Sequence, residues 1–198
     1  DVYLFGVEDE VAIINPLLLV TNDTAENGAG LTLVSVSNPV NGTVWLDGEG
    51  AIPFLPAQDF NDDAQEGRAF FDYTVADSCG RESTARVEVE VAPVNDAPVA
   101  TDNTYNGTED VAITGNAISD DTGAGADSDP DGDTLTLDAG SVGTFATTAG
   151  GSITLASDGG FTYTPPADFN GIDTFDYTVT DGALSDTATL TFNLAPAN

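Results

Sequence analysis

Short acidic side chains alternate with other residues in one segment of this chain, and their spacing suits a hard metal ion. Residues 127–133 read Asp-Ser-Asp-Pro-Asp-Gly-Asp, which places carboxylates at Asp127, Asp129, Asp131 and Asp133. Carboxylates one residue apart can turn toward a common centre, and the glycine permits a sharp turn between them. Calcium takes six to eight oxygen ligands in a flexible geometry. The segment therefore predicts a calcium-binding loop.

Two other interpretations of this loop stay open, an EF-hand and a solvated acidic loop without metal. Its first six positions fit an EF-hand, but residues 123–126 before it and 134–137 after it do not form amphipathic helices. The missing counter-charges favour a metal. From Ala97 onward the sequence has 15 Asp and one Glu but no Lys, Arg or His, so no internal salt bridge is possible there. Crowded like charges disfavour folding unless a cation neutralises them.

The overall composition excludes several classes of function. The 198 residues include three Arg, no Lys and no His against 34 acidic residues, a net charge of −31. Such a surface repels nucleic acid and anionic lipid, so we expect neither nucleic-acid binding nor membrane insertion. The chain has no nucleophile elbow, zinc-protease motif or glycine-rich phosphate loop, and we expect no enzyme activity. The single Cys79 cannot form an internal disulfide, and it is either incidental or pairs between chains.

The elements that must position the acidic residues repeat along the chain. The segment 71–77 recurs at 175–181, and short strands with period-two alternation fill both halves, punctuated by Gly and Asp turns. No segment carries a capped helical pattern. The sequence predicts an all-β chain of two tandem β-sandwich domains, 1–96 with the linker and 97–198. The absence of Met and the linker-like end at 195–198 lead us to expect a piece of a longer protein with a further repeat.

The end of the first repeat carries a family signature. The strand Tyr73-x-Val75-x-Asp77, followed after a paired strand by Pro-Val-Asn-Asp-Ala-Pro at 93–98, resembles the end of a cadherin repeat. The sequence is most similar to bacterial cadherin-like and VCBS-type tandem repeats of large secreted RTX-type adhesins. This resemblance implies two Ig/cadherin-like Greek-key β-sandwiches arranged end to end, with calcium at the junction.

The resemblance also implies which residues hold the calcium. In domain 1 they are Glu8, near the end of the first strand, and Asp59, in a loop. In the linker they are Asn95 and Asp96. In domain 2 they are the Asp-x-Asp pair Asp129 and Asp131, and Asp181 at the end of a later strand. In the linker, a plain turn at Asn95-Asp96 is the alternative.

The function that the resemblance implies is a calcium-rigidified extracellular module of a bacterial surface or secreted adhesin, either a spacer or a cell-adhesion segment. Its partners would be neighbouring repeats of the same chain, a cell-surface glycan or protein, or homophilic contacts. Two alternatives stay open: a calcium-dependent carbohydrate-binding module and a subunit of an extracellular filament or sheath. Alignment of the repeats puts Trp45 on an outward face, where it could stack on a sugar, although a core position is the simpler interpretation.

Overall fold

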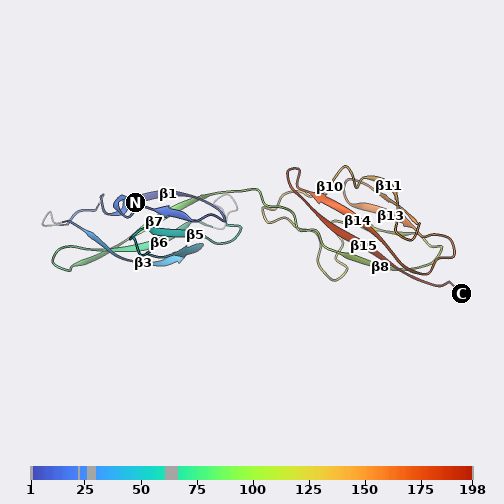
Figure 1. The fold of residues 1–198 in the computed structure, drawn as a ribbon, viewed down its shortest axis with the longest axis horizontal. Helices are drawn as coiled ribbons and strands as arrows, with labels where there is room; N and C mark the ends of the chain where they lie inside the picture. Colours follow the sequence, from blue (N-terminus) through green and yellow to red (C-terminus); the bar gives the residue numbers. More distant parts are fainter. Residues whose placement is uncertain (1, 22, 26–29, 61–66, 198) are drawn as a thin grey trace. The chain divides into compact units, whose positions relative to one another are not determined.

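The computed structural model describes residues 2–21, 23–25, 30–60 and 67–197. The chain divides into two compact units, residues 1–94 and 95–198, here called domain 1 and domain 2 (Figure 1). Apart from one helical turn, α1 (Leu17–Val20), the regular elements are strands, which confirms the expected all-β class. In the described part of the chain, no helix is long and apolar enough to cross a membrane.

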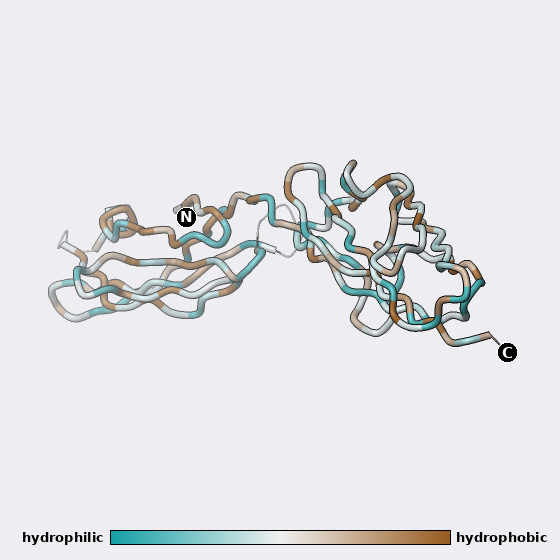
Figure 2. Tube along the Cα trace, turned by 45° about the vertical axis from the view of Figure 1, so that its right-hand side comes forward, coloured by the Kyte–Doolittle hydropathy of each residue, from teal (hydrophilic) through white to brown (hydrophobic). Residues whose placement is uncertain are grey.

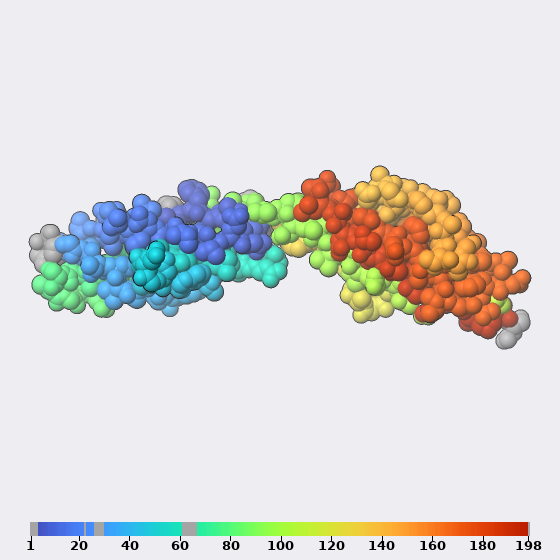
Figure 3. Space-filling model, in the orientation of Figure 1, coloured from blue at the N-terminus to red at the C-terminus, as the bar shows by residue number. Residues whose placement is uncertain are grey.

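Domain 1 is a sandwich of two sheets. The larger sheet has the strand order β1-β7-β6-β3, and the smaller one has the order β2-β5-β4. In Figure 3 the first segments of the chain (dark blue) lie beside the segment around residue 50 (cyan) on this domain. The first and last strands pair in parallel, from Val2 opposite Val87 to Val7 opposite Ala92. The strands are β1 (Val2–Val7), β2 (Ala12–Ile14), β3 (Thr32–Val40), β4 (Gly42–Val44), β5 (Ile52–Pro56), β6 (Ala69–Ala76) and β7 (Glu82–Ala92).

Domain 2 repeats this plan with sheets β10-β14-β15-β8 and β11-β12-β13-β9. Its first strand also pairs in parallel with its last, from Asn103 opposite Leu190 to Thr108 opposite Ala195. The strands are β8 (Asn103–Thr108), β9 (Ile113–Asn116), β10 (Thr136–Leu137), β11 (Gly143–Ala146), β12 (Ser152–Leu155), β13 (Gly160–Thr164), β14 (Gly171–Thr180) and β15 (Ser185–Ala195).

The alternating residues form the two cores, as the period-two pattern predicts. Phe71 in β6 is fully buried and stacks on Phe54 of the facing sheet, with ring centroids 6.0 Å apart. In domain 2, Tyr163 of β13 stacks on Phe192 of β15 at 3.9 Å. Figure 2 shows apolar and polar residues alternating along the strands of each domain. The core of each domain thus comes from the inward faces of its own two sheets.

Asp173 in β14 is a carboxylate buried completely inside domain 2. Its Oδ2 accepts hydrogen bonds from the hydroxyls of Tyr163 at 2.7 Å and Thr147 at 2.5 Å. Its Oδ1 accepts from the Thr148 hydroxyl at 3.0 Å and the Ala149 N–H at 2.7 Å. Burial alone raises the pKa of this carboxyl, but the hydrogen bonds outweigh burial and hold the pKa below its usual range. The ionised carboxylate therefore ties β14 to the turn after β11.

We expect Asp173→Asn to lower the free energy of unfolding at pH 7 by roughly 1–3 kcal/mol, because buried donors lose their acceptor. The folded pKa lies below the unfolded value, so this contribution is present above the unfolded pKa of about 3.9 and is lost as the pH falls through the folded pKa. Urea unfolding at pH 7 and below pH 3 measures it. Asp176→Asn, an exposed site on the same strand, is the control. Equal stability of Asp173→Asn and the parent at pH 7 would contradict this role.

Candidate metal centre

Asp129 organises the acidic loop of domain 2. Its Oδ1 accepts the backbone N–H groups of Asp131 at 2.9 Å and Asp133 at 3.3 Å, and its carbonyl accepts the Gly132 N–H at 3.1 Å. Gly132 has a φ of 76°, which a glycine adopts without strain. The Oδ2 of Asp129 is buried and has no hydrogen-bond partner among the described residues. A buried carboxylate oxygen in that state calls for a cation or water.

The linker residues of domain 2 reach this loop. The Asp96 N–H donates to the Oδ2 of Asp131 at 2.8 Å, and carboxylate oxygens of the two residues lie within 4.8 Å of each other. The Asn95 amide donates to the Oδ2 of Asp181 at 2.8 Å and to the Asp96 carbonyl at 3.1 Å. Hydrogen bonds thus connect linker, loop and strand end, and bring oxygen ligands of the kind that calcium prefers into one region of the domain.

Backbone N–H groups of the turn that follows β14 keep the Asp181 carboxyl ionised. Its Oδ1 accepts the N–H groups of Ala183 at 2.6 Å and Leu184 at 2.7 Å. These backbone hydrogen bonds, with the Asn95 amide, hold the pKa of the Asp181 carboxyl below its usual range. An ionised carboxylate at the end of β14 is the form that a metal needs.

Asp127 and Asp133 lie differently from the other acids of the loop. The carboxylate of Asp127 turns inward, where the Tyr177 hydroxyl donates to both oxygens at 3.0 Å and the Thr101 N–H donates at 2.7 Å. Burial raises the pKa of Asp127, and burial beside this carboxylate raises that of Tyr177. The side chain of Asp133 is exposed. The geometry gives Asp127 a bracing role and leaves Asp133 at the rim.

Domain 1 has the same tyrosine, but the Asp-Pro-Asp-Gly-Asp sequence of domain 2 does not recur after its acidic partner. The Tyr73 hydroxyl donates to the Asp23 carboxylate at 2.9 Å and to the Leu19 carbonyl at 3.3 Å. Burial, then the Asp23 carboxylate, raises the pKa of Tyr73 to about 12. Asp23 thus takes the place of Asp127, and Ala25 stands where domain 2 has Asp129.

Glu8 braces the chain where it leaves domain 1. The residue follows β1, is 1% exposed, and its carboxylate accepts the Val94 N–H. Its own N–H donates to the Ala92 carbonyl at 3.1 Å. Glu109 repeats the arrangement in domain 2, accepting the Ala197 N–H at 2.8 Å. The recurrence shows that the glutamate after the first strand holds the segment that follows the last strand.

Asp59 has a neighbour that the sequence did not single out as a ligand. Carboxylate oxygens of Asp9 and Asp59 lie within 4.8 Å of each other, and both residues have positive φ, 59° and 54°. In domain 2 the equivalent residues also have positive φ, and the Asp168 N–H donates to Asp110 at 3.0 Å. The signal that could have found Asp9 is the repeat itself, because Glu-Asp recurs at 109–110.

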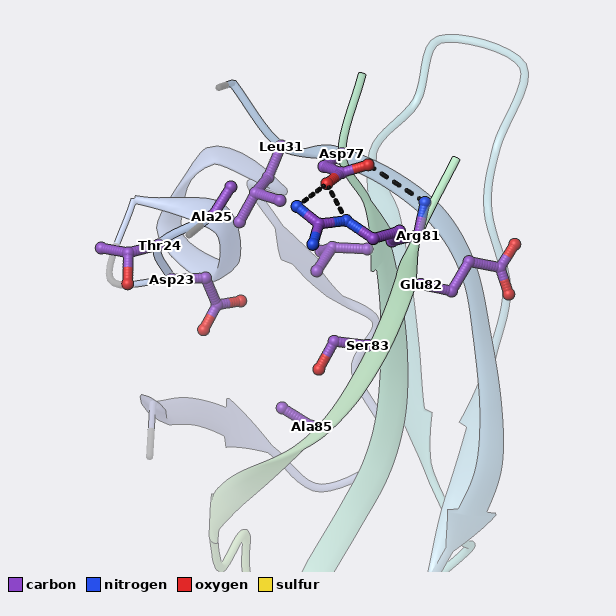
Figure 4. Close-up of a pocket in the computed structure, with 10 residues that line it drawn as sticks. Asp23, Thr24, Ala25, Leu31, Asp77, Arg81, Glu82, Ser83 and Ala85 are labelled. Carbon is purple, nitrogen blue, oxygen red and sulfur yellow. Dashed lines mark hydrogen bonds and ion pairs between the residues drawn. The ribbon is translucent and has the colours of Figure 1, made fainter. Parts of the chain in front are cut away.

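At the strand end of domain 1, a guanidinium supplies the positive counter-charge that domain 2 lacks. The Nε and one terminal nitrogen of Arg81 each lie 2.8 Å from the Oδ2 of Asp77. Figure 4 shows this ion pair, which lines a hollow of about 570 Å³. The Asp77 Oδ1 accepts the N–H groups of Cys79 and Arg81. The Arg81 N–H, together with the guanidinium, lowers the pKa of Asp77. The equivalent of Arg81 in domain 2 is Ser185, so only domain 1 supplies a cation here.

Comparison with known proteins agrees with this two-domain plan. Residues 95–196 match the family described as bacterial cadherin-like domain, and residues 2–90 match bacterial Ig domain. The search of curated proteins gives no match.

Among solved structures, the human desmocollin-1 ectodomain aligns with a TM-score of 0.50 at 11% identity, over 98% of this chain and 39% of that one. Human mucin-like protocadherin EC1-2 gives 0.48 at 20% identity, over 98% and 96%. The endo-fucoidan hydrolase MfFcnA4 from glycoside hydrolase family 107 gives 0.39 at 16%, over 99% and 28%. This chain therefore spans less than half of the hydrolase and of the desmocollin ectodomain, and the desmocollin likeness supports the cadherin-like fold.

We expect Arg81→Gln to lower the melting temperature of domain 1 by the same few degrees in calcium and in EDTA, because the cation lost is part of the chain. Calorimetry under both conditions measures the shift. Arg68→Gln, which breaks an exposed pair with Glu88, should change less. A destabilisation of Arg81→Gln that calcium fully reverses would contradict a built-in cation.

Proposed function

This chain belongs to the bacterial cadherin-like domain family, and on that premise we propose that it is a calcium-rigidified repeat module of a bacterial surface or secreted adhesin. Bacterial cadherin-like and Ig domains are adhesion-type extracellular modules, and families of this kind are typically not enzymes. In this function the module is a spacer or adhesive segment. Bound calcium restricts the hinge between its two domains.

The observation that carries the proposal is the buried Oδ2 of Asp129, which lacks a hydrogen-bond partner among the described residues. It belongs to a loop whose neighbouring carboxylates, Asp96 and Asp131, approach within 4.8 Å. Because domain 2 contains no Lys, Arg or His, no side chain of its own can neutralise these charges. All the available donors are hard oxygens, which fits calcium and excludes metals that require thiolate or imidazole.

The linker sequence supports ligands from both domains. Glu8 of domain 1 holds the Val94 N–H, and Asp131 of domain 2 holds the Asp96 N–H. These two N–H groups are two residues apart, so covalent geometry limits their separation to roughly 7 Å. We infer that Glu8, with Asp9 and Asp59, contributes ligands from domain 1, while Asn95, Asp96, Asp129, Asp131 and Asp181 contribute them from domain 2. An ion that takes ligands from both sets neutralises charge and stiffens the linker.

Removal of calcium should lower the melting temperature and broaden the distribution of distances within the whole chain. At a free calcium concentration one hundred times the Kd, linkage gives about 2.7 kcal/mol of stabilisation, which corresponds to several degrees. Calorimetry and small-angle scattering with calcium and with EDTA measure the two effects. If chelation changes neither, the calcium hinge is wrong.

Substitutions in the loop should separate ligands from bracing residues. We expect Asp129→Asn and Asp131→Asn to weaken calcium binding at least tenfold in isothermal titration, with little change in the EDTA melting temperature. Asp133→Asn removes the same charge from the exposed rim and should weaken binding less than threefold. Asp127→Asn should lower the melting temperature in EDTA as well, since an NH₂ group replaces one of the two oxygens that accept the Tyr177 hydroxyl. Equal losses of affinity in Asp131→Asn and Asp133→Asn would refute this assignment.

A further inference from the structure

The smaller sheet of domain 1 has an unusual outer face. Ile52 and Phe54 of its central strand point into the core and are fully buried, so Pro53 between them lies on the opposite side. Ile13 of β2 pairs with Pro53, and the Trp45 N–H, just after β4, donates to the Pro53 carbonyl at 3.2 Å. Ile13, Pro53 and Trp45 therefore form one row across the sheet.

This row is apolar and reaches solvent. Ile13 is 66% exposed and Trp45 42% exposed, whereas Pro53 between them is buried. Residues directly opposite in such a row have Cβ atoms about 5 Å apart, so Ile13 and Trp45 flank the proline on either side. Two more apolar residues lie on the same side of the sheet, each two positions from the row along the chain. They are Val11, which is 46% exposed, and Leu55, which is half-buried. We call these five residues, Val11, Ile13, Trp45, Pro53 and Leu55, the outer face.

Domain 2 shows that the fold does not require an apolar outer face. There the same row consists of Thr114, Thr162 and Thr154, paired residue for residue across β9, β13 and β12. The Thr154 hydroxyl also hydrogen-bonds that of Thr144 on the next strand, at 2.8 Å. Threonine is the expected residue on the solvated side of a sheet. The fold therefore accepts polar residues in this row, and the apolar row is particular to domain 1.

The charges around the outer face are acidic. Glu10 precedes Val11, and Asp47 and Glu49 lie in the turn after Trp45. The three arginines belong to β7 and the segments that flank β6, and each makes an ion pair with an acid there. A net charge of −31 on each chain opposes the approach of a second copy, whereas it attracts a cationic surface.

We propose that the outer face of domain 1 is a docking surface for a cationic protein partner. The partner places apolar side chains over Ile13 and Trp45, and Lys or Arg side chains against Glu10, Asp47 and Glu49. Contact of this kind has an apolar centre and a charged rim, as specific protein interfaces have. The surface contains none of the residues assigned to calcium, so it works independently of the proposed hinge.

Trp45 is the only tryptophan of the chain, so its fluorescence reports directly on this face. The probe is a synthetic eight-residue peptide of alternating Leu and Lys, titrated into the full chain in calcium and in EDTA. We expect the same blue shift of Trp45 emission in both buffers, and at least tenfold weaker binding when the salt concentration rises from 0.05 to 0.5 M. Peptides of alternating Ser and Lys, or Leu and Glu, should bind at least tenfold more weakly than the Leu-Lys peptide.

Variants place the binding on the outer face. Ile13→Thr introduces the residue that domain 2 carries there and should weaken binding at least tenfold, with Trp45 kept as the reporter. Ile172→Thr makes the same substitution on β14 of domain 2, at a side chain that is also 66% exposed, and should leave binding unchanged. Circular dichroism melts verify that both variants fold.

Three results would overturn the proposal. The first is no response to the Leu-Lys peptide, or equal responses to all three peptides. The second is concentration-dependent self-association in sedimentation velocity that Ile13→Thr abolishes, which would make a second copy the occupant. The third is a salt-independent shift of Trp45 emission with neutral oligosaccharides, which would make the face a carbohydrate site. Calcium dependence of the peptide response would also contradict the independence stated above.

Discussion

Carboxylates without enough cations are the constraint on which this structure depends. Domain 2 has no basic side chain, so its acids must be satisfied by backbone N–H groups, by hydroxyls and by side-chain amides. Asp173 is held by three hydroxyls and two backbone amides, and Asp127 by Tyr177 and a backbone amide. Each such acid fixes a turn or a strand end. The Asp129 loop differs, because one of its oxygens is buried without such a donor in the described part of the domain.

Domain 1 meets the same constraint with arginine. Asp77 and its equivalent Asp181 each accept two turn N–H groups, but Asp77 also pairs with the Arg81 guanidinium, whereas Asp181 accepts the side-chain amide of Asn95. Two repeats of one fold thus balance the same carboxylate by different means.

The sequence predicted the fold well because period-two alternation is a direct record of which side chains face the core. Phe71, Tyr73 and Val75 are buried as the alternation requires. The spacing of residues 127–133 did not reveal which carboxylate turns inward. That depends on the position of the Tyr177 hydroxyl, which belongs to a strand 50 residues further along the chain. Asp9 stayed unassigned because proximity to Asp59 arises only when β2 pairs with β5. Trp45 is exposed, which agrees with the repeat alignment but shows that the core position, the simpler interpretation of the sequence, was wrong.

The pairing of first and last strands has a mechanical consequence. In each domain the chain enters along one strand and leaves along its parallel neighbour, through six paired positions. Tension applied at the two ends of a domain pulls these strands in opposite directions along their length, so the hydrogen bonds between them are loaded together in shear. Such a ladder cannot open one bond at a time as a hairpin does. Each sandwich is therefore built to transmit force, and its resistance lies in the ladder between its first and last strands.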